Sequence, residues 1–124
     1  NMLVKEFPSK IGYYAKDGVN YETIIANQDE PQINLAGMGI DSNVDLRDYF
    51  KKTSHGFIQG NFSEQFLTLP HDQFLPKLDS FIEQMSVLSP EERSGWVCGL
   101  GHGVLKTTPQ ENVKEFVERI RASF

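Results

Sequence analysis

The apolar positions of the chain alternate between short compact runs and longer stretches with helical spacing. Short runs rich in β-favouring or small apolar residues predict strands at 11–15, 33–40, 57–59 (ending on Gly60-Asn61) and from Trp96 onward. Apolar residues three and four positions apart predict helices around Tyr21–Ile25, Leu46–Phe50, Phe74–Met85 and Val113–Ile120. The predicted order is therefore strand then helix, four times over.

The last predicted helix carries the clearest boundary signals. Thr108 suits the N-cap, Pro109 suits the first helical position, and Glu111 is placed to complete a capping box. Its predicted buried face is Val113, Phe116, Val117 and Ile120, and Glu115 and Arg119 form a favourable i, i+4 pair on the solvent side. In the preceding helix, Pro76 either belongs to the first turn or kinks the helix.

The connections between strands favour a parallel sheet. Asp17-Gly18 is the one hairpin-like dipeptide next to a predicted strand, and a helical pattern follows it. Four parallel βα units are half of a (β/α)8 barrel, which needs about 250 residues, whereas an open doubly wound sheet needs helices on both faces. Short glycine-rich strands and one-sided helices favour the half barrel. Because such a half leaves strand edges and one face uncovered, we expect it to pair with another copy or to belong to a longer enzyme.

Composition narrows the class of protein. The chain of 124 residues is long enough for one domain, which we place at 1–124. A net charge of −5, with Lys51-Lys52 as the basic pair, argues against nucleic acid or an anionic membrane as partner. No apolar run approaches the roughly 20 residues that span a bilayer, and no signal peptide is visible. The single cysteine, Cys98, fits a reducing cytosol, so we expect a cytoplasmic protein.

Polar residues follow the predicted strands, where barrel enzymes place their chemistry. They are Lys16, Asp17, Asp41, Ser42, Asn61 and His102. Helix capping explains Asp41, Ser42 and Asn43 at least as well as function does. His102 favours function, because glycines on both sides leave it no helix face or strand pleat to pack on and let a ligand come close. His55 and His71, beside a turn and a proline, are expected at the surface.

Other interpretations of the same residues remain open from pattern alone. Gly99, Gly101 and Gly103 at alternate positions are compatible with a phosphate cradle, although the spacing matches no dinucleotide or P-loop fingerprint. Cys98 with His102 is a poor metal set, because a third ligand is missing. Asp17 or Asp41 could pair with His102 in acid–base chemistry. A Cys98–His102 nucleophilic pair is disfavoured, because a thiol inside a buried strand is inert.

Four segments, in order, carry a family resemblance. They are 14–18 (YAKDG), 39–46 (GID followed by VDL), 59–62 (QGNF) and 100–105 (LGHGVL), and Thr108-Pro109, 111–113 and 116–117 follow the last. With them the chain resembles the carboxyl-terminal part of uroporphyrinogen decarboxylase. The resemblance implies a (β/α)8 barrel that removes carbon dioxide from the acetate side chains of uroporphyrinogen to give coproporphyrinogen, without metal or organic cofactor. It also implies a homodimer and a tetrapyrrole as the small-molecule partner.

The resemblance assigns one catalytic residue to this chain, His102, which would hydrogen-bond a substrate carboxylate. We also expect Gly101, Asn61 and Asp41 to contact substrate, and we expect no metal ligand. The family's pyrrole-binding aspartate and carboxylate-binding arginines belong to the amino-terminal part, so we expect this chain alone to be inactive. Ser42 stands where the family usually has Trp, and 62–64 (FSE) where it usually has Leu-Asp-Pro, which changes the expected shape of the pocket.

Two alternatives compete with the decarboxylase. Zinc-dependent cobalamin or coenzyme M methyltransferases share this superfamily, but their zinc site needs His-x-Cys where this chain has Tyr14-Ala15-Lys16. The other alternative is a non-catalytic fragment that folds as an oligomer.

Overall fold

Four parallel strands form the centre of the molecule. The computed structural model describes residues 10–14, 35–52 and 56–124. The strands are β1 (Gly12–Tyr14), β2 (Gly37–Gly39), β3 (Phe57–Phe62) and β4 (Trp96–Leu100), arranged in the order β1-β2-β3-β4. Every neighbouring pair is parallel, as the sequence predicts. The helix predicted around Tyr21–Ile25 and the start of the predicted strand 33–40 lie outside the described residues.

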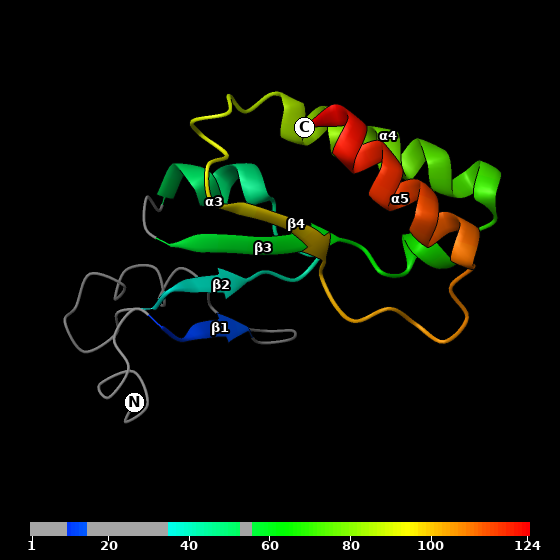
Figure 1. The fold of residues 1–124 in the computed structure, drawn as a ribbon, viewed down its shortest axis with the longest axis horizontal. Coiled ribbons are helices and arrows are strands. Elements are labelled where there is room, and N and C mark those ends of the chain that lie inside the picture. The colour runs from blue at the N-terminus through cyan, green and yellow to red at the C-terminus, as the bar shows by residue number, and fades with distance from the viewer. Residues whose placement is uncertain (1–9, 15–34, 53–55) are drawn as a thin grey trace.

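The described helices cover one face of this sheet. They are α3 (Leu46–Lys52), the 3₁₀ turn η1 (Phe66–Thr68), α4 (His71–Ser86) and α5 (Gln110–Ser123). Figure 1 shows α3, α4 and α5 on the same side of the strands. One row of side chains across the sheet faces them and includes Met38 and Ile58, both almost completely buried. None of the described helices is long and apolar enough to cross a membrane.

The other face of the sheet is not covered by these helices. Tyr14, Gly39, Gln59 and Val97 are cross-strand neighbours in the adjacent row. Tyr14 is 47% exposed and Val97 46% exposed. Side chains of successive strand residues point to opposite faces, so this row necessarily lies away from the helices. One covered and one open face is the arrangement expected of barrel strands separated from the rest of their barrel.

The core divides into two clusters between the sheet and the helices. The first joins β2 and β3 to α3 and the end of α4, with Met38, Ile40, Tyr49, Ile58 and Met85 among its members. The second surrounds Phe62, whose ring centroid lies 5.2 Å from Phe116 and 6.2 Å from Phe74. Aromatic burial of this kind fixes α4 and α5 over the ends of β3 and β4.

The predicted capping box of the last helix is wrong. Helix α5 begins at Gln110, with Pro109 as an N-cap that makes no side-chain hydrogen bond. Proline has no side-chain acceptor, and the buried Thr108 hydroxyl has no partner among the described residues. A reciprocal pair forms instead in the turn before β4, where Ser89 N–H donates to Glu92 Oε2 (2.7 Å) and Glu92 N–H donates to Ser89 Oγ (3.2 Å).

Other local predictions have mixed outcomes. The Glu115–Arg119 pair is confirmed at 3.6 Å, and Arg119 also bonds Asp79 of α4. Val117, predicted to be buried, is 40% exposed. Pro76 lies inside α4, at its sixth residue, rather than in the first turn.

His71 is not the free surface residue that the sequence suggested. It is half-buried, and its Nδ1 lies 2.9 Å from Oδ1 of Asn112, a fully buried side chain. Asn112 Nδ2 donates to the Leu67 and Leu69 carbonyls, so its oxygen must be the acceptor from His71. This network joins the starts of α4 and α5 to η1. His55 lies outside the described residues.

Candidate functional site

The carboxyl ends of the four parallel strands lie at one edge of the sheet (Figure 1). Asp41 follows β2, Asn61 lies near the end of β3, and Gly101 and His102 follow β4 directly. Lys16 and Asp17, the candidates after β1, lie outside the described residues. The described candidates, with Ser42 directly after Asp41, therefore approach one edge, as the barrel hypothesis requires, but they do not share one environment.

His102 faces a hollow on the open side of the sheet. The hollow has a volume of about 390 Å³, and its walls include Tyr14, Gly39, Gln59, Leu100 and His102. His102 is exposed, and its Nδ1 lies 3.3 Å from the Gly103 carbonyl oxygen. A carbonyl oxygen accepts only, so this contact needs a proton on Nδ1 and leaves Nε2 directed to other partners. The histidine is thus available to a ligand in the hollow.

Gly101 sets the path of the segment that carries His102. Its N–H donates to the Phe62 carbonyl (2.8 Å), and its own carbonyl accepts from the Tyr14 hydroxyl (2.6 Å). A Cβ built on Gly101 would lie 2.4 Å from the backbone nitrogen of Ser42. Only glycine allows so close an approach of two backbones. The chain after β4 therefore folds back across the ends of β3 and β2 toward β1.

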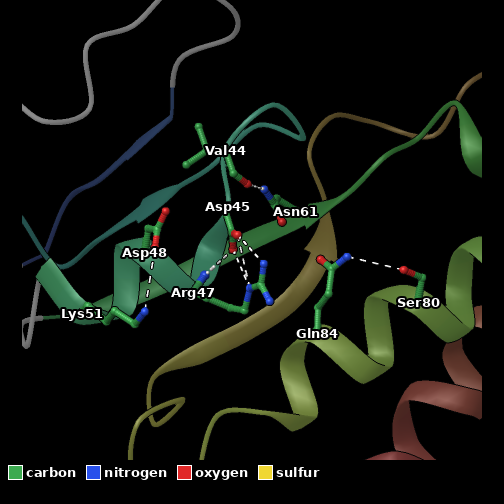
Figure 2. Close-up of polar contacts among 8 residues, drawn as sticks. All are labelled: Val44, Asp45, Arg47, Asp48, Lys51, Asn61, Ser80 and Gln84. Carbon is green, nitrogen blue, oxygen red and sulfur yellow. Dashed lines mark hydrogen bonds and ion pairs between the residues drawn. The ribbon is translucent and has the colours of Figure 1, made fainter.

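Asn61 is occupied by backbone carbonyls of the loop after β2. It is 8% exposed, and its Nδ2 donates to the carbonyls of Asp41 (2.7 Å) and Val44 (2.5 Å). Figure 2 shows the bond to Val44 beside the Asp45–Arg47 pair at the start of α3. Asn61 lies on a second hollow of about 690 Å³, between α3 and α4, and not on the hollow that holds His102.

Asp41 also serves this loop. It is 6% exposed, and its Oδ1 accepts from the Asn43 N–H at 2.9 Å, which closes an Asx turn before α3. This bond is a turn and not a cap of α3, because α3 begins at Leu46 and the Arg47 N–H in its first turn donates to Asp45 Oδ1 at 2.9 Å. Substrate contacts by Asp41, Asn61 and Gly101 stay predictions.

Cys98 takes no part in the open hollow. Its side chain packs in the cluster beneath α4 and α5, on the covered face of the sheet. Burial raises the pKa of the Cys98 thiol to about 12, so at neutral pH it stays protonated and a poor nucleophile. Within 10–14, 35–52 and 56–124, no three His, Cys, Asp or Glu side chains gather as a possible metal-ligand set.

The hollow also includes Tyr14 and Gln59, which the sequence pattern did not single out as site residues. Both line the hollow with His102 and lie in one cross-strand row. A signal was present, because Gln59 is a polar residue inside a strand that the parallel-sheet prediction expects to be apolar. Strand alternation then places Gln59 and Tyr14 on one face once the register is known. The register itself is a tertiary property.

A parallel βα sheet with one open face and its site at the carboxyl edge is part of a (β/α)8 barrel of the kind that enzymes use. The uroporphyrinogen decarboxylase family model matches residues 3–123, and the chain belongs to this family. Both findings agree with the resemblance seen in the sequence. The predicted partial barrel is thereby confirmed.

Relatives named uroporphyrinogen decarboxylase support the same family. The protein of Chlamydia trachomatis serovar L2 is 35% identical over 62% of this chain and 22% of its own length. That of Chlamydia abortus is 35% identical over 72% of this chain and 27% of its own length. That of Solibacter usitatus is 32% identical over 73% of this chain and 26% of its own length. The chain thus matches about a quarter of the length of these relatives.

Proposed function

We propose that the full-length polypeptide containing these residues is a uroporphyrinogen decarboxylase. It would remove the four acetate carboxyl groups of uroporphyrinogen to give coproporphyrinogen. The observation that best supports this is the exposed His102, which faces a hollow at the carboxyl edge of a sheet belonging to this family. This chain would supply four strands of the barrel and one wall of the substrate cavity.

In this proposal His102 holds a substrate carboxylate. Each decarboxylation adds a proton to a pyrrole carbon and breaks the bond to the carboxyl carbon with release of carbon dioxide. The remaining methylene carbon then gains a proton while the pyrrole carbon loses the one it had taken up. The carboxylates that wait their turn need fixed donors. With one proton of the imidazole directed at the Gly103 carbonyl, Nε2 donates to a carboxylate only when the ring is doubly protonated. Such a hydrogen bond is charge-assisted and about twice as strong as a neutral one.

The test compares the full-length wild type with His102→Ala and His102→Gln. Uroporphyrinogen is incubated with each, and the products are separated by their number of carboxylates. We expect stepwise loss by the wild type, a fall of about 10- to 100-fold in kcat/KM for His102→Ala, and partial recovery in His102→Gln, whose amide N–H lies near the position of Nε2. A wild type that leaves uroporphyrinogen unchanged, or an unaffected His102→Ala, would overturn the proposal.

A further inference from the structure

We propose that Tyr14 is a positioning residue for His102. Its hydroxyl donates to the carbonyl oxygen of Gly101, and this bond fixes the peptide from which His102 enters the hollow. The inference rests on the proposed role of His102 in holding a substrate carboxylate. It adds to the site a residue of β1, distant from His102 in the sequence, whose hydrogen bond sets the position of that histidine.

The bond exists because the segment after β4 folds back over the sheet. Strands β1 and β4 are the outer strands of the order β1-β2-β3-β4. With neighbouring strands about 4.8 Å apart, a flat sheet would separate them by roughly 14 Å, beyond the reach of a tyrosine side chain. Yet the Tyr14 hydroxyl lies 2.6 Å from the Gly101 oxygen, across 87 positions of sequence. The hydrogen bond therefore forms only because the segment after β4 lies across the sheet, within reach of Tyr14.

Gly101 is held from three strands at once. Its N–H is fixed by the end of β3, its α-carbon lies against Ser42 after β2, and its carbonyl is fixed by Tyr14 of β1. The carbonyl of Gly101 and the nitrogen of His102 belong to the same planar peptide unit. A hydrogen bond to that carbonyl thus sets the plane in which His102 begins. Within the part of the chain that the structure describes, the polar contact of the His102 ring is with the adjacent Gly103 carbonyl, so the placement of the ring depends on the backbone.

The Tyr14 ring is itself well placed to act as an anchor. A Cβ built on Gly39 would lie 2.7 Å from Cδ2 of Tyr14, so the ring rests directly on the backbone of β2. Phenylalanine keeps this packing and removes only the hydroxyl. Tyr49 of α3 offers a control for the loss of a tyrosine hydroxyl, because it lies in the core on the covered face of the sheet and does not line the hollow.

The test uses the full-length protein as wild type, Tyr14→Phe, Tyr49→Phe, His102→Ala and the Tyr14→Phe/His102→Ala double variant. We expect Tyr14→Phe to raise KM for uroporphyrinogen about 3- to 10-fold, the effect of one hydrogen bond, in a protein that keeps its fold. Tyr49→Phe should have the KM of the wild type. In the His102→Ala background Tyr14→Phe should add nothing, because it acts through the missing side chain.

The outcomes separate this inference from the proposed function. An equal Tyr14→Phe effect in both backgrounds would mean that Tyr14 contacts substrate itself, and no effect would mean that the bond positions nothing. Either result overturns the inference while leaving decarboxylation and His102 in place. A readout without turnover is the ¹⁵N-labelled imidazole signal of His102, assigned by its loss in His102→Ala. It should change in Tyr14→Phe but not in Tyr49→Phe, and an unchanged signal would overturn the inference even if the proposed reaction fails.

Discussion

The ends of β3 and β4 look alike in sequence and behave differently in the structure. Each has a glycine followed by a polar residue, Gly60-Asn61 and Gly101-His102. Asn61 is 8% exposed and bonded to two backbone carbonyls, whereas His102 is exposed beside the open hollow. The difference shows that a polar residue at the end of a barrel strand is available to a ligand only if the neighbouring loop does not need it.

The surrounding backbone explains why the two residues differ. Asn61 is still within β3, next to the loop after β2, whose Asp41 and Val44 carbonyls accept its amide protons. A buried carbonyl without a donor is costly, so Asn61 has a structural task. His102 lies beyond β4, and its Nδ1 lies near the Gly103 carbonyl instead of these two carbonyls. Substitution of Asn61 should therefore lower mainly the stability of the protein, whereas substitution of His102 should lower mainly its activity.

The largest expected effect on stability comes from Asn61→Ala. It leaves two partly or fully buried carbonyls without their donor, so we expect the free energy of unfolding to fall by about 2–4 kcal/mol. Urea unfolding monitored by circular dichroism measures this, with His102→Ala as the control that should stay within about 0.5 kcal/mol of the wild type. An Asn61→Ala protein of wild-type stability with impaired substrate binding would instead assign Asn61 to the ligand.

The two glycines that flank His102, Gly101 and Gly103, should respond differently to substitution by alanine. Gly101→Ala would place a methyl group 2.4 Å from the Ser42 nitrogen, so the backbone would have to move. We expect the free energy of unfolding to fall by about 1–3 kcal/mol and the activity to fall with it. Gly103→Ala is the matched control, because a Cβ there meets no atom within 4 Å. Thermal unfolding of both variants tests this. Equal behaviour of the two would show that close packing at Gly101 does not hold the segment.

The smallest effect concerns the ion pair next to Asn61. The Arg47 side chain, by hydrogen bonding, holds the pKa of Asp45 below its usual value of 3.8, against an opposing effect of desolvation. A carboxyl whose pKa falls on folding stabilises the protein above its unfolded pKa, and this is lost as pH falls through the folded value. Asp45→Asn keeps the cap on the Arg47 N–H, so it tests charge alone.

We expect Asp45→Asn to cost less than about 1 kcal/mol at pH 7, because both partners are partly exposed. The difference from the wild type should shrink below about pH 4 in a series of unfolding curves. Asp48→Asn, which loses the longer and more exposed pair with Lys51, is the control and should change stability at pH 7 less than Asp45→Asn does. A difference that persists at low pH would contradict the ion-pair explanation.

Local and periodic features of the chain were predictable to different degrees. Spacing of apolar residues located the described strands and helices, because burial against a sheet imposes that spacing directly. The capping box predicted at Thr108 is wrong, because a cap depends on which residue is the first of the helix. The helix begins one residue later than predicted, at Gln110, which makes Pro109 the N-cap. His71 was misplaced because its partner, Asn112, lies 41 positions away. Nothing local to His71 signals that contact.

By itself, the sequence determined the parallel βα architecture, the one-sided helices and His102 as the leading candidate. These follow from periodicity, glycine positions and a motif, all of which are local. Only the tertiary structure decided that Asn61 supports a loop, that Tyr14 and Gln59 share the hollow with His102, and that Tyr14 reaches Gly101. These facts depend on strand register and on the path of the chain after β4, where backbone groups distant in sequence must find hydrogen-bond partners.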